Sequence, residues 1–277
     1  VQFLQQGGDL GATLQRVETP GNLGLTALCS TTWRIYKGSF WVIASLYLTV
    51  WMPCNLLVAY VEAQHWIKDD LSASVRLNSW VEALIGVIAT GAILHVARSS
   101  WNGLRSSYGE ALRFGLRKWG VLLRGQILIN FATGLGLLLL IIPGILVLVR
   151  SVFLPSFLVE EGGSATNGLH SSWHLAKGHF WRLAGFSIIV GVLASLPTFI
   201  LLAITGLLNV LLEEFAESSP LLDQAWLLDW IAESFGGITF PFATIFFFVF
   251  YKALCSQSEV FGSPSPTNAP RLFTKLP

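Results

Sequence analysis

Long apolar stretches alternate with short polar segments along most of the chain. A helix needs about 20 apolar residues to cross about 30 Å of hydrocarbon, and six stretches of roughly this kind are present. Pro143 and Gly144 predict a tight turn between the third and fourth helices, while Pro155 and Pro197 predict kinks in the fourth and fifth. The predicted membrane-spanning helices cover residues 40–61, 77–96, 119–142, 145–159, 180–212 and 237–253.

The composition also favours a membrane protein over a soluble one. Of the 277 residues, 53% are hydrophobic and 12% are charged, whereas charged residues make up about 25% of soluble domains. The formal net charge is only +1, so no excess of charge points to a nucleic-acid partner. Cys29, Cys54 and Cys255 lie far apart, and we expect unpaired structural thiols. The first residues lack the basic start and apolar run of a cleavable signal peptide.

The distribution of positive charge predicts the orientation of the helices. With six crossings, most of the 17 Lys and Arg residues fall on the side that holds both termini. Lys68 and Arg76 fall on the opposite side, and Arg150 falls within the fourth helix. Because cytoplasmic loops are enriched in Lys and Arg, we expect both termini in the cytoplasm.

A motif of 13 residues occurs twice, as TTWRIYKGSFWVI at 31–43 and as SSWHLAKGHFWRL at 171–183. Similarity of this kind indicates a repeated structural unit. Each copy begins on a segment with an apolar helical stripe, which predicts an amphipathic helix lying flat on the membrane, and ends where a span begins. We interpret the motif as the corner between the two helices. The expected interfacial anchors are Trp33, Lys37, Gly38, Phe40, Trp41, Trp119, Trp173, Lys177, Gly178, Phe180 and Trp181.

A third copy of this plan precedes the third span, as ALRFGLRKWGVLL at 111–123. Arg105, Arg113 and Arg117 lie opposite an apolar stripe there, so we expect them to face lipid headgroups. The alternative to a true repeat is that Lys, Gly and Trp are common wherever a helix enters a membrane.

The predicted fold class is therefore an all-α membrane protein. Its six transmembrane helices would form three hairpins, each preceded by an amphipathic cytoplasmic interfacial helix. The predicted segments are an N-terminal cytoplasmic segment at 1–24, a membrane domain at 25–255 with repeats at 25–97, 104–159 and 164–255, and a cytoplasmic tail rich in Pro and Ser at 256–277.

Residues 137–183 resemble a bacterial group of six-span inner-membrane proteins. This group comprises the membrane domain attached to some glycerophosphodiester phosphodiesterases and its stand-alone relatives of unknown function. The resemblance implies a helical fold in the bacterial inner membrane but no activity, because the phosphodiesterase chemistry belongs to a separate soluble barrel. It rests on Ile142, Pro143, Gly144, Ile145, Arg150, Pro155, Glu160, Glu161, Gly162, Trp173, Gly178, Phe180 and Trp181.

Candidate chemistry is sparse. We find no hydrolase, metalloprotease, phosphate-loop or dinucleotide motif, and we expect no enzymatic activity and no cofactor. His170 and His174 lie one helical turn apart, but without a nearby Cys we expect solvated histidines and no metal site. Glu82 and Arg150 fall at similar depths within spans, and a charge in a membrane is costly unless it is paired. We therefore expect them to form a structural pair inside the bundle.

Three functions fit these observations. The first is a non-enzymatic protein that binds or organises membrane phospholipid, which the flat basic helices favour. The second is an accessory subunit that packs against another integral membrane protein or complex, for which the Phe-rich sixth span and the Pro-rich tail would provide contacts. The third is a small-solute transporter, because many transporters contain repeats and broken helices.

Overall fold

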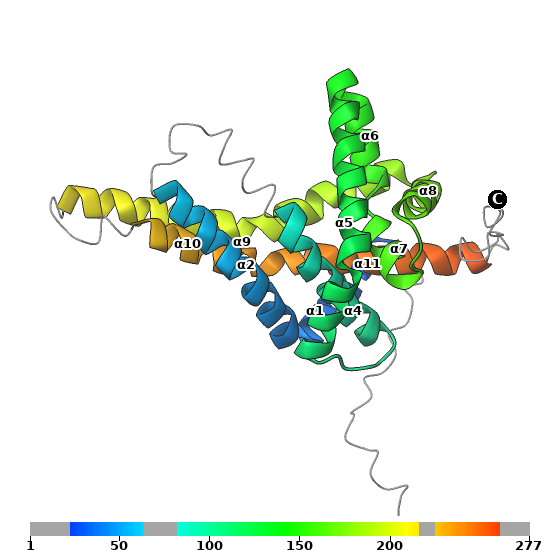
Figure 1. The fold of residues 1–277 in the computed structure, drawn as a ribbon, viewed down its shortest axis with the longest axis horizontal. Coiled ribbons are helices and arrows are strands. Elements are labelled where there is room, and N and C mark those ends of the chain that lie inside the picture. The colour runs from blue at the N-terminus through cyan, green and yellow to red at the C-terminus, as the bar shows by residue number, and fades with distance from the viewer. Residues whose placement is uncertain (1–22, 64–81, 216–224, 261–277) are drawn as a thin grey trace, which may run out of the picture.

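The computed structural model describes residues 23–63, 82–215 and 225–260, which form helices joined by turns and contain no strand (Figure 1). Six of the helical segments within these ranges are long and apolar enough to cross a membrane, in agreement with the predicted number. The all-helical fold compatible with a multi-pass membrane protein is thus confirmed. The elements are α1 (Leu25–Gly38), α2 (Phe40–Ala63), the π-helix η1 (Glu82–Gly86), α4 (Val87–Trp101), α5 (Tyr108–Leu139), α6 (Ile141–Arg150), α7 (Leu154–Glu160), α8 (Ala165–Ala176), α9 (Phe180–Phe215), α10 (Ala225–Gly236), the 3-10 helix η3 (Gly237–Thr239) and α11 (Phe240–Val260).

The hydrophobic core is built around α11. Its side chains Phe246, Phe248 and Phe250 are fully buried, and the helix packs against α1, α4 and α9. Phe248 meets Trp101 edge to face at 6.4 Å, and Phe250 meets Phe153 at 5.5 Å, geometries that aromatic pairs prefer. These three rings therefore fill the interior of the chain itself, and the expectation that the Phe-rich span provides a surface for a partner stays a prediction.

Two of the three expected corners are present as breaks between helices. α1 ends at Gly38 and α2 begins at Phe40, and the intervening Ser39 donates its N–H to the Ile35 carbonyl. α8 and α9 are separated by a turn in which Gly178 has φ +87°, a conformation that strains residues with a β-carbon. The repeated motif therefore marks a helix–turn–helix corner in both of its copies.

The expected corner before the third span is absent, which corrects the prediction of a separate flat helix there. Residues from Tyr108 to Leu139 form one continuous helix, α5. Its first half packs tightly on α4, because Gly91 and Gly115 let the two backbones approach: a β-carbon added at Gly115 would lie 2.5 Å from the Ile88 carbonyl oxygen. Packing against α4 thus takes the place of the lipid interface.

The turn between the third and fourth spans lies slightly earlier than predicted. The chain turns at Leu140, which has extended backbone angles, and Pro143 and Gly144 lie in the first turn of α6. Proline is tolerated there because the first N–H groups of a helix lack intrahelical partners. Gly136 and Gly144 then contact each other across the hairpin, since a β-carbon at Gly136 would lie 2.8 Å from the Gly144 Cα.

Of the two predicted kinks, the structure contains one. The fourth span breaks into α6 and α7 at residues 151–153, directly before Pro155 at the start of α7. Proline has no N–H to donate to the Ser151 carbonyl, as a continuous helix would require, and its ring would clash with that carbonyl. α9 continues through Pro197 as one helix of 36 residues. At about 1.5 Å per residue it is about 54 Å long, well beyond the about 30 Å of a hydrocarbon core.

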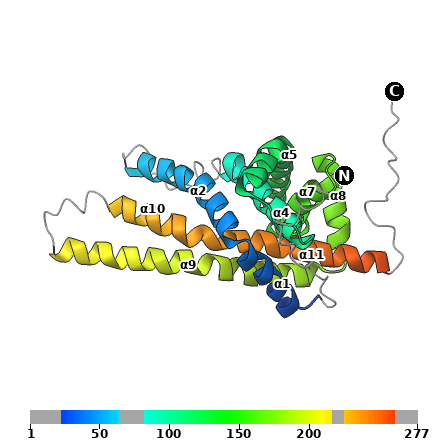
Figure 2. The same cartoon turned by 90° about the horizontal axis from the view of Figure 1, so that it is seen from below.

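The six spanning segments do not form one parallel bundle. Figures 1 and 2 show α9 beside the rod formed by α10, η3 and α11, with the α5–α6 hairpin standing across this layer. The divergence has two local causes: α5 packs on α4, and the break before α7 lets α6 leave the layer. α10, which the sequence assigned to an external connection, pairs with α9 and α2, and α11 runs to Val260, beyond the predicted start of the tail.

Candidate functional site

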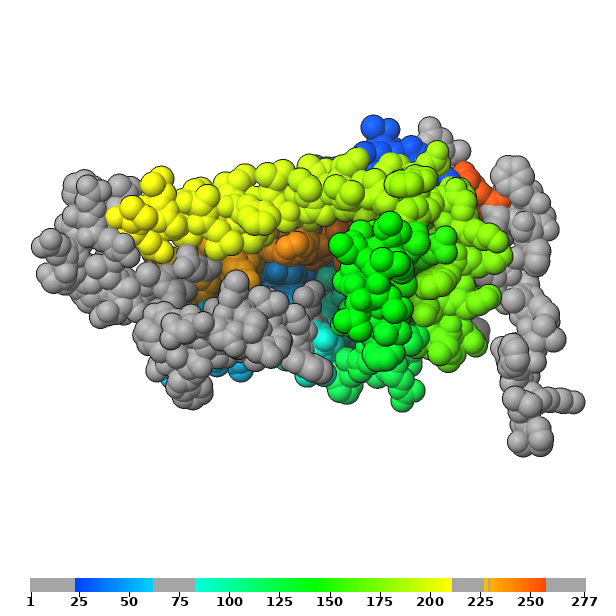
Figure 3. Space-filling model, turned by 90° about the horizontal axis from the view of Figure 1, so that it is seen from above, coloured from blue at the N-terminus to red at the C-terminus, as the bar shows by residue number. Residues whose placement is uncertain are grey.

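Two adjoining cavities lie where the diverging helices meet. The α2–α11 cavity has a volume of about 450 Å³, and the α4–α6 cavity has a volume of about 530 Å³. Trp51 and Thr90 border both of them. Volumes of this size and a mostly apolar lining are typical of small-molecule sites. Figure 3 shows a hollow between α9 and the end of the α5–α6 hairpin, with α2, α10 and α11 visible on its floor.

The α2–α11 cavity combines aromatic walls with a few polar groups. Tyr47 and Trp51 lie one turn apart on α2, with ring centroids 6.1 Å apart. Asn55, one turn further on, is buried at 6% exposure. A polar side chain at this place costs free energy unless it finds a hydrogen-bonding partner. The other lining residues are Ala89, Thr90, Ile93, Thr198, Glu233, Phe240, Pro241, Ala243 and Thr244.

The α4–α6 cavity is lined by uncharged side chains. Gln126 donates from Nε2 to Asn130 Oδ1 at 3.1 Å, so two amides on α5 hold each other at the cavity wall. The Thr133 hydroxyl, one turn further along, is buried and has no partner among the described side chains. The remaining wall is Trp51, Ala83, Gly86, Val87, Thr90, Ile129, Gly134, Leu137 and Leu148.

Hydrogen bonds between distant segments hold the cavity walls in place. Trp230 on α10 donates its indole N–H to the Met52 carbonyl of α2 at 3.1 Å. Tyr36 on α1 donates to the Ile238 carbonyl at 2.8 Å, and Trp119 on α5 donates to the Leu84 carbonyl at 2.7 Å. Two of the acceptor carbonyls lie in irregular helices, Ile238 in η3 and Leu84 in η1, whereas Met52 lies inside α2 directly before Pro53.

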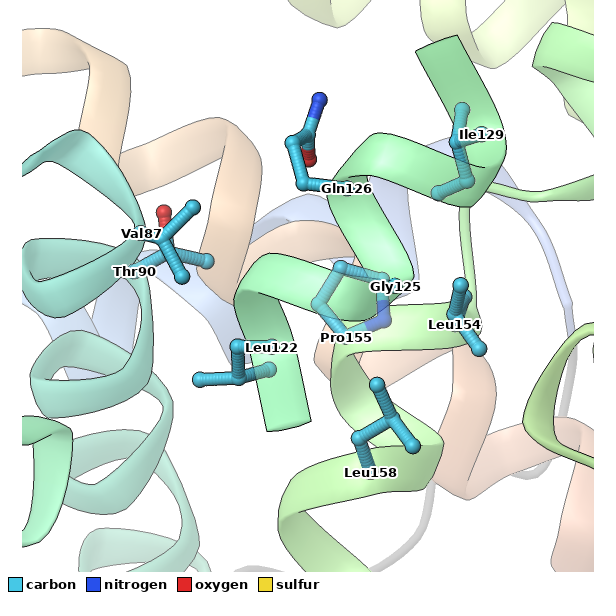
Figure 4. A pocket seen from close by; sticks show the side chains of 9 residues that line it. All are labelled: Val87, Thr90, Leu122, Gly125, Gln126, Ile129, Leu154, Pro155 and Leu158. Atoms are coloured by element: carbon cyan, nitrogen blue, oxygen red, sulfur yellow. The ribbon is translucent and has the colours of Figure 1, made fainter. Parts of the chain in front are cut away.

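A third gap lies beside the α4–α6 cavity, between α4, α5 and α7, and shares Thr90 and Gln126 with it. Figure 4 shows Leu122, Leu154, Pro155 and Leu158 around it, with Gln126 at its edge. Its volume is about 20 Å³, which is enough for a single water molecule. Gly125 lines the gap, and a β-carbon there would lie 3.0 Å from Leu158. This gap is a packing defect beside the candidate site and too small for a ligand.

Arg150 has a neighbour that the sequence did not predict. Its guanidinium carbon lies 5.9 Å from the centre of the Trp173 ring, a cation–π geometry. Its backbone carbonyl accepts a hydrogen bond from Ser172 at 2.6 Å, so α8 packs on the break that ends α6. The side chain of Glu82 lies outside the described side chains, and its pairing with Arg150 stays a prediction.

The expected interfacial residues lie mostly on the surface of the chain. Trp41 and Trp181 are 82% and 85% exposed, and each packs edge to face on the phenylalanine before it, Phe40 or Phe180, at 5.4 Å. Trp33, Trp119 and Trp173 are also exposed. The same holds for Lys37, Gly38, Lys177, Gly178, Arg105, Arg113, Arg117, His170 and His174.

A network of charges joins the helix ends opposite to the cavities. Lys252 Nζ lies 2.9 Å from Glu160 Oε2, and Arg98 Nε lies 3.6 Å from Glu160 Oε1. These contacts tie the ends of α4, α7 and α11 together. Ser39 and Ser100 add a hydroxyl–hydroxyl bond of 3.0 Å at the same ends of α2 and α4. Segments that were all predicted to end in the cytoplasm therefore meet at one place.

Glu161 provides a pH-dependent contribution to stability. Burial raises the pKa of Glu161 above its ordinary 4.5, and neighbouring Glu160 adds to the effect, while a hydrogen bond from Tyr251 at 2.9 Å and the charge of Lys252 oppose it. Because the folded state holds this proton more tightly than the unfolded state, the contribution is full below pH 4.5 and is lost as the pH rises through the raised pKa.

We expect Glu161→Gln to remove this pH dependence, because glutamine still accepts the Tyr251 hydrogen bond but carries no charge. Thermal unfolding in detergent at pH 5 and pH 8 measures it. The stability of the variant relative to the natural chain should increase from pH 5 to pH 8. An identical difference at both pH values would contradict the assignment.

The comparison with protein families gives one match. A family model described as "Domain of unknown function (DUF7847)" matches residues 81–254, more than half of the chain. No curated protein and no solved structure matches the chain. The matched range includes most of the candidate site, and the resemblance to phosphodiesterase-linked membrane domains stays a prediction.

Proposed function

We propose that this protein, a member of the DUF7847 family of unknown function, is a non-enzymatic integral membrane protein that binds membrane phospholipid. The proposal is based on the two cavities. The ligand would occupy the α2–α11 and α4–α6 cavities from the side of the molecule. We further propose that the protein lies in the bacterial inner membrane with both termini in the cytoplasm. The cluster of Arg98, Lys252 and the first corner at one end supports this orientation.

The observation that carries the proposal is the position of the two cavities between helices that diverge. A phospholipid is an apolar molecule with one polar end, and these cavities have apolar walls with polar groups at Asn55, Thr90 and Thr133. The α5–α6 side of the α4–α6 cavity carries the apolar side chains Ile129, Leu137 and Leu148. Acyl chains could extend along these walls without exposing them to water.

Filling the shared wall of the cavities tests the proposal. We expect Thr90→Trp to reduce the phospholipid that copurifies with the protein in mild detergent by several-fold, because the indole would occupy both cavities. The matched control is Ile204→Trp on α9, where the side chain is 56% exposed and the new ring meets only lipid or detergent. Lipid extraction and mass spectrometry of both variants, with thermal unfolding to check their fold, give the measurement. Equal amounts of lipid in both variants would contradict the proposal.

The second candidate function is an accessory subunit of a larger membrane complex. It is favoured by α9, which buries little of its apolar surface and is longer than a bilayer requires. Exposed residues such as Ile188, Phe199 and Leu207 would form the contact. Stoichiometric copurification of another protein after crosslinking through α9 would favour this function over lipid binding.

A further inference from the structure

The α4–α6 cavity contains hydrogen-bonding groups but no charge. Apart from Trp51, all of its lining residues come from 83–94 and 125–149, and neither range contains an acidic or basic side chain. An ionised group that enters such a cavity loses its hydration without gaining an opposite charge. The cavity therefore disfavours phosphate and ammonium groups, and it favours a part of a ligand that is polar and uncharged.

Two amide side chains on α5 leave N–H donors free at the wall of this cavity. Gln126 donates to Asn130 at 3.1 Å, and each amide has two N–H groups. Neither side chain makes another hydrogen bond within the part of the chain that the structure describes. Polar residues that hold transmembrane helices together bond from one helix to another, whereas this bond stays within α5. The remaining donors are therefore available to a ligand.

The depth of the two amides matches the ester groups of a phospholipid. Arg124 is exposed and is the last charged residue before the uncharged range 125–149, and arginines on spanning helices extend toward the headgroups. At about 1.5 Å per residue, Gln126 lies about 3 Å and Asn130 about 9 Å further along the helix axis. In a phospholipid the ester groups lie between the phosphate and the acyl chains, which is the corresponding level.

The walls beyond the amides suit acyl chains. Ile129, Leu137 and Leu148 line the cavity on its hairpin side, and Trp51 adds an aromatic side chain from α2. Leu137 and Leu148 are also exposed on the surface of the chain. An acyl chain that leaves the ester region would thus pass from the cavity into the bilayer along apolar side chains only.

We propose that Gln126 and Asn130 bind the ester carbonyl oxygens of a glycerophospholipid in the α4–α6 cavity, so that the protein prefers ester-linked lipids to ether-linked ones. The inference rests on the proposed function, since it assigns the ester region of the lipid to one of the two cavities. An ester carbonyl is an uncharged acceptor, which matches free N–H donors in an uncharged cavity. An ether-linked lipid lacks this carbonyl and would leave the donors without a partner in the membrane.

Native mass spectrometry with two lipids tests the inference. The purified full chain is incubated with equal amounts of dipalmitoyl phosphatidylglycerol and di-O-hexadecyl phosphatidylglycerol, which have the same headgroup and chains of equal length but differ in the ester and ether linkages. We expect the ester lipid to be retained about tenfold more than the ether lipid, the effect of one or two neutral hydrogen bonds.

Variants assign the preference to the cavity. Asn130→Leu and Gln126→Leu should each reduce the ester preference to about threefold or less, while the total amount of bound lipid stays similar. The matched control is Asn209→Leu on α9, the same substitution in a spanning helix whose side chain lines neither cavity; it should keep the full preference. Two single variants are compared, so the assignment is tested even if one of them does not fold. A full preference in both would overturn the assignment.

Two results separate the inference from the proposed function. Equal retention of both lipids by the natural chain, or a preference for the ether lipid, with loss of both lipids in Thr90→Trp, would overturn the ester site and leave lipid binding intact. Retention that is weak for both lipids in the natural chain and unchanged in Thr90→Trp would overturn both.

Discussion

Gly115→Ala is expected to destabilise the protein by about 2–3 kcal/mol, the cost of overpacking a tight contact. The added β-carbon would lie 2.5 Å from the Ile88 carbonyl oxygen and 3.1 Å from the Ala92 N atom. Both are backbone atoms, so α4 and α5 must separate for the methyl group to fit. Since this pair of helices carries Thr90 and Gln126, the separation should also reduce lipid binding.

The matched control for this substitution lies on the same helix. A β-carbon at Gly120 meets nothing within 4 Å, so Gly120→Ala should leave stability unchanged or raise it by up to about 1 kcal/mol through helix propensity. Unfolding of both variants in detergent, followed by circular dichroism, gives the comparison. Equal stability of the two variants would mean that α4 and α5 are not in close contact.

Glu160→Gln is expected to cost about 2 kcal/mol, because it removes the acceptor of a charged hydrogen bond and leaves two positive charges without compensation. Glu160 is 12% exposed and receives Lys252 at 2.9 Å and Arg98 at 3.6 Å. Water therefore screens these contacts less than it screens a surface ion pair. The ends of α4, α7 and α11 should become less tightly joined.

A double-mutant cycle separates this effect from a general loss of packing. If Lys252 stabilises the fold through Glu160, the double variant Glu160→Gln with Lys252→Gln should be less destabilised than the sum of the two single variants. Stabilities that simply add would show that the two side chains do not interact. Glu110→Gln on α5 provides the carboxylate control, because its cap is retained.

The sequence was informative where local physics decides the outcome. Runs of apolar residues of bilayer length identified the six spanning segments, and the positions of Gly178 and Pro155 identified a corner and a break that the structure contains. In each case the cause lies within a few residues of its effect, in the glycine backbone or in the missing proline N–H.

The features of the fold and the candidate site that the sequence did not predict depend on contacts between distant segments. The close approach of Gly115 to α4 makes α5 continuous, although its first half has the pattern of a surface helix. The burial of Phe246 and its neighbours depends on how α11 is surrounded, which an apolar run alone does not indicate. The cavities lie between helices far apart along the chain, so neither their volume nor the residues that share their walls could be read from the sequence.

Crosslinking with a phospholipid that carries a photoreactive group on its acyl chain tests the proposed lipid site most directly. In nanodiscs containing this lipid, peptide mapping should locate the adducts mainly on the cavity walls, around Trp51, Thr90 and Thr133, and Thr90→Trp should remove them. Adducts spread over the exposed faces of α9 and the α5–α6 hairpin, with no enrichment at the cavities and no change in the variant, would contradict the proposal.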